Sequence, residues 1–291
     1  MAYATSTDGI RIHYEVTGRL SGPPVVLIQG LGADKHGWDM QRLGLGWAHR
    51  FVALDNRGAG RSDKPLGAYS LEQMATDAVS VMDDAGIETA HIVGASMGGG
   101  ISQLITLMYP DRVRSLTLTC TSCRNHQWRT ELLAGWAETA RVEGMGAMTR
   151  EAARWVIGPR SFRRLLPAIG WLGPLGLGRP RHAFANQVDA ILALEETSDR
   201  DLGAELGSIE VPTLVVVGNQ DILTPRGDSE ELAELIPTAE LVVISGAAHG
   251  LMVEHASTYN QVLRDFLKRA EIAYQQRIGD TEAVVAGAAA G

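Results

Sequence analysis

Gly94-Ala95-Ser96-Met97-Gly98 carries the clearest chemistry in this 291-residue chain. It is a G-x-S-x-G pattern that directly follows an apolar run ending at Val93 and precedes a helix predicted over Gly99 to Tyr109. A strand that turns abruptly into a helix crowds the serine between them. The residues two positions away must therefore lack bulk, and the hydroxyl projects from the sheet edge. The pattern predicts a nucleophilic Ser96.

A serine hydroxyl needs a histidine to accept its proton, and that imidazole needs a carboxylate to fix its tautomer. His249 lies just beyond the last apolar run, and Asp221 lies just past the run before it. The chain order Ser96, Asp221, His249 is the order found in G-x-S-x-G hydrolases. Asp55, at another strand end, is the competing acid. Its place before the glycine-rich segment 56–62 favours a structural role in bracing that turn.

These residues require a central sheet to position them. The segment Ile10 to Val16 alternates apolar and polar residues, as a half-buried strand does. Continuous short apolar runs, typical of parallel strands buried on both faces, are Val25 to Ile28, Phe51 to Leu54, His91 to Val93, Val113 to Leu118, Leu214 to Val217 and Leu241 to Ile244. Helical patterns separate them. The fold class predicted is α/β, with a mostly parallel sheet flanked by helices.

The sheet pattern stops between residues 122 and 208, where helical fragments rich in Arg and Trp replace it. We expect an inserted helical cap there, because the segment is far longer than an ordinary loop. The predicted organisation is a core of residues 1–121 and 209–273, a cap of 122–208, and a tail of 274–291 without apolar periodicity. Ser70 with Gln73 forms a capping box that should start a helix ending at Gly86.

Composition excludes several classes of protein. With 45% hydrophobic and 21% charged residues, the chain has enough apolar side chains for a globular core. The formal charge of −8 argues against nucleic acid or an anionic membrane as the main partner. No apolar block suited to a signal peptide follows Met1, and Cys120 and Cys123 are expected to be ordinary reduced thiols, so a cytoplasmic location is expected.

Taken together, these motifs resemble the α/β-hydrolase fold superfamily, roughly over Ile10 to Arg269. The resemblance implies an oxyanion hole made by the backbone N–H groups of Leu31 and Met97. Family members usually carry His where this chain has Gln29, which affects the bracing of that loop. Serine at position 96 disfavours epoxide hydrolases and haloalkane dehalogenases, which attack with aspartate. The chain looks most like the group of enol-lactonases, carboxylesterases, perhydrolases and C–C hydrolases.

The inserted segment offers candidate substrate contacts. Trp128 and Trp155, with Trp136 and Trp171, form either an aromatic lid or the packing core of the insertion. The stretch Arg124 to His182 holds 10 Arg against 4 Glu. That excess either attracts an anionic substrate or lies on a solvated face. Arg150 and Arg154, and Arg160 beyond them, cluster beside Trp155 and are the candidates for attracting an anionic substrate.

The expected activity is hydrolysis of a small carboxylic ester or lactone through an acyl-enzyme, with Ser96, Asp221 and His249 as the triad. Alternatives are C–C bond hydrolysis or perhydrolysis on the same fold, or a non-catalytic receptor for a small ligand. No nucleotide-binding loop and no metalloprotease motif occurs, so no cofactor and no metal are implied. The expected partner is the small-molecule substrate, and association into a homo-oligomer is left open.

Overall fold

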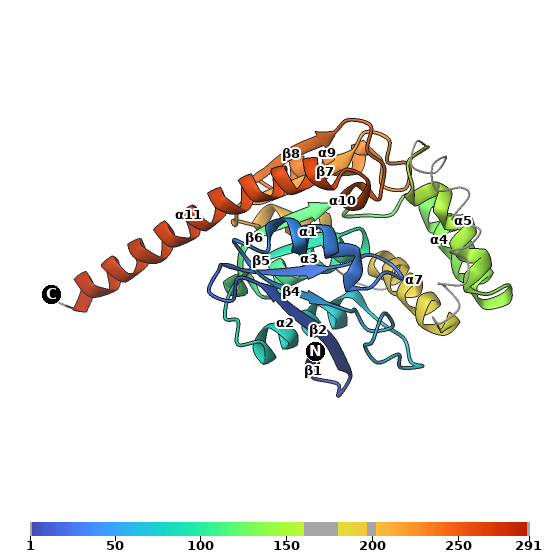
Figure 1. The fold of residues 1–291 in the computed structure, drawn as a ribbon, viewed down its shortest axis with the longest axis horizontal. Coiled ribbons are helices and arrows are strands. Elements are labelled where there is room, and N and C mark those ends of the chain that lie inside the picture. Colours follow the sequence, from blue (N-terminus) through green and yellow to red (C-terminus); the bar gives the residue numbers. More distant parts are fainter. Residues whose placement is uncertain (1, 160–179, 197–201, 290–291) are drawn as a thin grey trace.

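A computed structural model describes residues 2–159, 180–196 and 202–289 (Figure 1). Within these residues an eight-stranded sheet has the order β1-β2-β4-β3-β5-β6-β7-β8. β2 runs antiparallel to β1 and to β4, and the remaining neighbours are parallel. This confirms the predicted mostly parallel sheet. The strands are β1 Ala2–Thr5, β2 Arg11–Gly18, β3 Pro24–Ile28, β4 Arg50–Leu54, β5 Ala90–Ala95, β6 Val113–Thr119, β7 Thr213–Gly218 and β8 Ala239–Ile244.

Helices cover both faces of the sheet, and each face has its own apolar core. On one face pack α2, α3 and α9, through residues such as Met82, Leu104 and Leu232. The other face carries α1 and α11, through Leu45 and Phe266. The bounds are η1 Lys35–Trp38, α1 Asp39–Leu45, α2 Leu71–Asp84, α3 Met97–Met108, η2 Pro110–Arg112, α9 Arg226–Leu235, α10 Leu251–Glu254 and α11 Ala256–Ala289.

The start of α2 follows the predicted capping box. The Ser70 hydroxyl accepts from the N–H of Gln73, and the Gln73 side chain accepts from the N–H of Ser70, both at 3.1 Å. These two bonds satisfy amide groups that a helix start otherwise leaves unpaired. At the other end Gly86 has φ 65°, a conformation that glycine adopts without cost. Local sequence therefore determines both limits of this helix.

A helical insertion separates β6 from β7 in the chain. Its described helices are α4 Gln127–Val142, α5 Met145–Val156, α7 Arg181–Glu196, α8 Leu202–Glu205 and η4 Leu206–Ser208. α4, α5 and α7 share a small apolar core that includes Trp136, Met148 and Val188. Figure 1 shows these three helices together at one end of the molecule. They lie inside the segment 122–208 for which a cap was expected.

The C-terminal helix is longer than the sequence pattern indicated. α11 begins at Ala256 and continues to Ala289, through most of the segment expected to be a tail without packed structure. Its second half lacks an apolar stripe, but Ala, Gln, Glu and Arg favour a helix even where nothing packs against it. In Figure 1 it extends well past the sheet, away from α4 and α5. Among the described helices, none is both long and apolar enough to cross a membrane.

Candidate active site

Ser96 lies at the sharp turn between β5 and α3. Its φ of 54° and ψ of −122° are unusual for a residue with a side chain. Such a conformation costs about 1–3 kcal/mol and persists only where its surroundings hold it. Here the Ser96 N–H donates to the carbonyl of Thr119 at 2.9 Å, and the Thr121 hydroxyl donates to the Ser96 carbonyl at 2.8 Å. The neighbouring strand β6 and the residues after it thus hold the turn.

The glycines on either side of Ser96 are required by close packing. A Cβ atom on Gly94 would lie 2.1 Å from the carbonyl oxygen of Gly98. A Cβ on Gly98 would lie 2.2 Å from the carbonyl oxygen of Ile28 on β3. Both distances are far inside van der Waals contact. The requirement for small residues two positions from the serine, expected from the sequence, has this geometric basis.

His249 and Asp221 meet after the last two strands. Asp221 follows β7 and His249 follows β8, and their Oδ2 and Nδ1 atoms are 2.8 Å apart. Both residues are buried. Because Nδ1 faces the carboxylate, the imidazole presents its Nε2 atom elsewhere. An imidazole held in this way is suited to accept a proton from a hydroxyl group.

Thr224 is a supporting residue that the sequence reasoning missed. Its N–H and that of Leu223 each donate to Asp221 Oδ1 at 2.9 Å, and its hydroxyl donates to Oδ2 at 2.8 Å. Burial alone would raise the pKa of Asp221, but His249 and these donors outweigh it, so the pKa is lowered. The carboxylate is thus ionised at neutral pH. Asp side chains commonly accept the backbone N–H two residues on, so the Leu223 contact had a local signal in the sequence, whereas the Thr224 hydroxyl contact had none.

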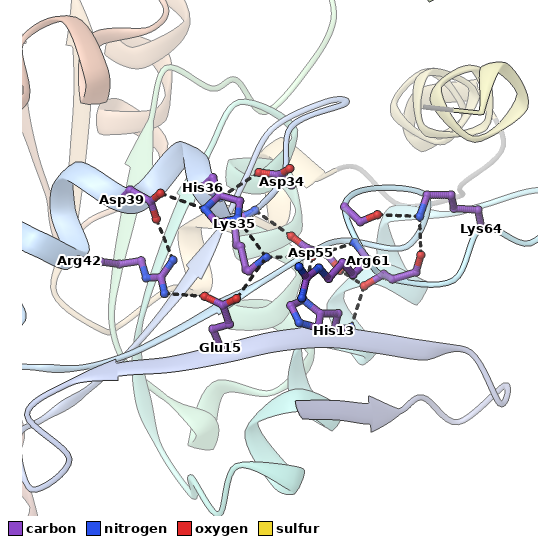
Figure 2. Close-up of polar contacts among 12 residues, drawn as sticks. His13, Glu15, Asp34, Lys35, His36, Asp39, Arg42, Asp55, Arg61 and Lys64 are labelled. Carbon is purple, nitrogen blue, oxygen red and sulfur yellow. Dashed lines mark hydrogen bonds and ion pairs between the residues drawn. The ribbon is translucent and has the colours of Figure 1, made fainter. Parts of the chain in front are cut away.

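Asp55 has a different set of partners (Figure 2). Its carboxylate contacts the ring of His13 at 2.9 Å and accepts the N–H groups of Lys35 at 2.9 Å and Arg61 at 3.0 Å. A Cβ on Gly60, where φ is 47°, would lie 2.3 Å from the Asp55 carboxyl carbon. Burial raises the pKa of Asp55. The two N–H donors, the Lys35 ammonium and His13 lower it by more, so the pKa lies below its ordinary value. These contacts support the bracing role proposed for Asp55.

The loop between β3 and η1 lies against Ser96. A Cβ on Gly30 would lie 3.0 Å from Ser96 Cβ and 3.5 Å from its Oγ. The Gly30 N–H donates to Gln29 Oε1 at 2.8 Å, and the Ala33 N–H donates to the Gly30 carbonyl at 3.2 Å. The Gly32 N–H donates to Gln187 of α7 at 2.9 Å. Among residues 30–33 of this loop, Leu31 is therefore the one whose N–H has no partner in the described structure.

A second free N–H belongs to Met97. Met97 is the first residue of α3, where amide groups have no partner within the helix. Leu31 and Met97 line the same cavity as Ser96. Gln29, at the position where the resemblance noted from the sequence leads one to expect histidine, turns its side chain back onto Gly30. The Gln29 carbonyl in turn accepts from the Asn56 side chain at 2.8 Å, so this loop keeps a polar brace.

Ser96 and His249 both line a cavity of about 390 Å³ between the sheet and the helical insertion. Most of its wall is apolar, from residues such as Leu133, Trp136, Val156, Phe184 and Leu223. Its size fits a small molecule. Cys123 also lines it.

Two arginines line the cavity, and each is paired with a carboxylate. Arg129 is buried and bonds Asp228 of α9, and its remaining guanidinium donors go to Asn125, Leu223, Ser122 and Arg124. Arg124 pairs with Glu231. Within the described lining, these are the two side chains of Arg, Lys, Asp or Glu type. The cavity wall thus carries no uncompensated positive charge there.

The four predicted substrate contacts lie elsewhere. Arg150 and Arg154 are exposed, whereas the face of α5 toward the cavity carries Met148, Thr149, Ala152, Ala153 and Val156. Trp128 is 39% exposed and stacks on Trp155 at 6.2 Å, and neither lines the cavity. Trp136 does line it, as part of the packing core of the insertion. Trp171 and Arg160 lie outside the described residues.

The two cysteines are unpaired and buried. Burial, with the Asp221 carboxylate beside it, raises the pKa of the Cys120 thiol, and burial raises that of Cys123 to about 11. Both therefore stay protonated at neutral pH. Cys120, Asp221 and His249 each place a ligand atom within 4.8 Å of the others, the one such group found among the described residues. Because the carboxylate and imidazole already bond each other, this group gives no reason to invoke a metal.

Known proteins share this arrangement of elements. A family model described as the alpha/beta hydrolase fold matches residues 23–145 and 160–256. A protein of Variovorax paradoxus (strain S110), named as the carbamate hydrolase RutD, is 32% identical over 271 residues, covering 89% of this chain and 96% of that protein. The 3-oxoadipate enol-lactonase 2 of Acinetobacter baylyi is 25% identical over 270 residues, covering 91% and 96%. The crystal structure of the enol-lactonase from Burkholderia xenovorans LB400 superposes with a TM-score of 0.83 at 28% identity, over 92% of this chain and 100% of that one.

Proposed function

The chain belongs to the alpha/beta hydrolase fold family and is a hydrolase, and from this premise we propose that it cleaves a small carboxylic ester or lactone with Ser96 as nucleophile. The observation that carries the proposal is the 2.8 Å contact between His249 Nδ1 and Asp221 in the cavity that Ser96 lines. A base oriented by a carboxylate, lining the same cavity as a serine at a strained turn, is the arrangement that supports acyl transfer.

In the proposed reaction, His249 takes the proton of the Ser96 hydroxyl while Oγ forms a bond to the carbonyl carbon of the substrate. The electron pair of the C=O bond moves to oxygen, where the N–H groups of Leu31 and Met97 stabilise the charge. The C–O bond to the leaving group then breaks, and His249 gives its proton to the departing oxygen. Water, deprotonated by His249, attacks the acyl-enzyme, and Ser96 leaves with the proton. The products are a carboxylic acid and an alcohol, joined in one molecule if the substrate was a lactone.

The cavity favours an uncharged substrate. Its wall is mainly apolar, and Arg124 and Arg129 are each neutralised by a carboxylate. Among the described residues of this wall, a free carboxylate would lose hydration without gaining a partner, which is costly. We therefore do not retain the anionic substrate considered from the charge of the segment Arg124 to His182. The helical insertion, which supplies much of this wall, is the proposed cap.

The names of the relatives suggest carbamates as a second substrate class. A carbamate, like an ester or lactone, presents a carbonyl carbon with a heteroatom leaving group, so the same residues would act on it. C–C hydrolysis, perhydrolysis and a receptor role without turnover remain alternatives of the same fold. A panel of a p-nitrophenyl ester, a lactone and an N-alkyl carbamate of matched size would rank the three classes.

The decisive experiment combines a fluorophosphonate probe with Ser96→Ala. We expect the wild-type protein to be labelled and to hydrolyse p-nitrophenyl butyrate. Ser96→Ala should lose labelling and lower kcat by a factor on the order of 10⁴, because only the oxyanion donors and binding remain. An equal melting temperature would show that the variant is folded. Near wild-type turnover by Ser96→Ala would refute the mechanism, and saturable binding of a small ester without labelling would indicate a receptor.

A further inference from the structure

Gln187 connects the helical insertion to two separate loops of the core. It lies on α7 and is only 1% exposed. Its Oε1 atom accepts the N–H of Gly32, in the loop after β3, at 2.9 Å. Its Nε2 atom donates to the carbonyl of Arg57, in the turn after β4, at 2.8 Å. One buried amide thus bonds two backbone groups of the core, of which Gly32 lines the cavity of the candidate site.

The anchor at Arg57 is rigid. The Arg57 guanidinium is buried and makes two 2.7 Å bonds to Asp77 of α2 and one of 2.9 Å to Asp8. The next residue, Gly58, has φ 86°, and a Cβ there would lie 2.8 Å from the ring of Tyr69 and 3.3 Å from Gln187 Nε2. α7 therefore sits directly on this turn. The position of the Gln187 side chain is fixed from the core side.

The Oε1 atom of Gln187 bonds the loop that contains Leu31. The N–H groups of Gly30, Gly32 and Ala33 all have partners, and only that of Gly32 is held by a residue from outside the loop. The Gly32 N–H and the Leu31 N–H lie in successive peptide planes, which are joined by the φ and ψ of Leu31. The bond from Gln187 therefore holds the peptide plane next to the one that carries the Leu31 N–H.

We propose that Gln187 is a positioning residue that fixes the Leu31 N–H for the oxyanion, so that the seating of α7 sets the efficiency of the chemical step. This inference rests on the proposed hydrolase function. A preorganised donor stabilises the charge that develops in the transition state, and a small displacement removes much of that benefit. Gln187 bonds the loop and does not line the cavity, so it makes no contact of its own with the ester. Loss of this bond should therefore lower turnover and leave ground-state binding unchanged.

The test is Gln187→Met, which keeps the length of the side chain and removes both bonds. Asn186→Ala is the matched control: Asn186 is the preceding residue of α7 and donates to the Gly67 carbonyl at 2.8 Å, a bond between α7 and the core that does not reach the loop of Leu31. For each variant, kcat and KM on p-nitrophenyl butyrate, the melting temperature, and the inhibition constant of an alkyl boronic acid are measured. The boronic acid forms a tetrahedral adduct with the serine and so reports on the oxyanion donors.

We expect Gln187→Met to lower kcat by about 10- to 100-fold and to leave KM within about threefold of the wild-type value. The inhibition constant of the boronic acid should rise by a factor close to the fall in kcat. Asn186→Ala should change neither kcat nor inhibition. If Gln187→Met does not fold, Gln187→Leu is measured in its place. Two results in a folded Gln187 variant would overturn the inference: an unchanged kcat with an unchanged inhibition constant of the boronic acid, or a rise in KM that matches the fall in kcat while that inhibition constant stays the same. In either case, labelling of Ser96 would still support the hydrolase function. A wild-type protein that is neither labelled nor active would instead refute the function itself.

Discussion

Two buried aspartates, Asp55 and Asp221, have similar surroundings but different roles. Asp55 and Asp221 each follow a parallel strand, and opposing donors lower the pKa of both carboxyl groups despite burial. Besides the His13 ring, the carboxylate of Asp55 accepts the backbone N–H groups of Lys35 and Arg61, so its charge organises backbone. The donors to Asp221 are His249 and two residues that hold the carboxylate toward it.

Asp221→Asn should therefore impair chemistry and Asp55→Asn should impair folding. The amide at 221 would hold the wrong tautomer of His249, and kcat should fall by a factor on the order of 10⁴ with little change in melting temperature. Asp55→Asn should lower the free energy of unfolding by about 2–4 kcal/mol, because it leaves buried donors poorly paired. Urea unfolding and steady-state kinetics on both variants check this. Normal melting with lost turnover in Asp55→Asn would assign the acid to Asp55 instead.

At the scale of single elements, α5 shows why charge counted along a sequence is a weak guide to substrate. Arg150 and Arg154 do share one helix face, as their spacing predicts, but that face is exposed. The apolar and small residues of the opposite face line the cavity. Sequence spacing gives which residues share a face, whereas the direction of that face depends on how α5 packs on α4.

Reversing both charges should consequently leave substrate choice unchanged. For an acyl ester ending in a carboxylate and its methyl ester of the same shape, we expect the neutral compound to have the higher kcat/KM, by about tenfold or more. Arg150→Glu with Arg154→Glu should alter that ratio by less than about twofold at low salt, since exposed charges are screened within about 8–10 Å at moderate ionic strength. A wild-type preference for the carboxylate that salt and the double variant both abolish would restore the anionic-substrate hypothesis.

α11 is tied to the amino ends of β5 and β6 by a cluster at the opposite end of these strands from Ser96. Glu271 of α11 accepts from Arg114 through both oxygens at 3.1 Å and contacts the buried ring of His91 at 3.0 Å. Burial raises the pKa of Glu271, but His91, Gln275 and Arg114 outweigh it and bring it to about 2. Burial lowers the pKa of His91.

This cluster should make stability fall on the acid side. Both groups have lower pKa values folded than unfolded, so the unfolded chain binds more protons and acid favours it. The loss from His91 begins as pH falls below about 6.5, and that from Glu271 runs from about 4.5 toward 2. Glu271→Gln should lower the free energy of unfolding at pH 7 by on the order of 1 kcal/mol, since the carboxylate is partly solvated, and flatten its decline between about pH 5 and 3. Urea titrations at several pH values measure both. Identical slopes in variant and wild type would contradict this.

Across the whole molecule, the sequence predicted features that depend on neighbouring residues. The turn at Ser96 and the helix start at Ser70 follow from a few adjacent positions, and the apolar runs sufficed for the parallel sheet. Gln187 could not be found in this way, because it meets Gly32 across 155 positions of chain and no local pattern marks it. The continuation of α11 was missed for the opposite reason: intrinsic propensity holds it helical without an apolar stripe.

The length of α11 also provides a point of attachment remote from the cavity. Figure 1 places the far end of this helix on the opposite side of the molecule from α4 and α5, whose residues line the cavity. A bead or electrode surface coupled through that end would meet neither the cavity nor the loop held by Gln187. The intervening helical turns, at about 1.5 Å per residue, would act as a built-in spacer between the support and the sheet. The protein is thus suited to oriented immobilisation through its C-terminal side without an added linker.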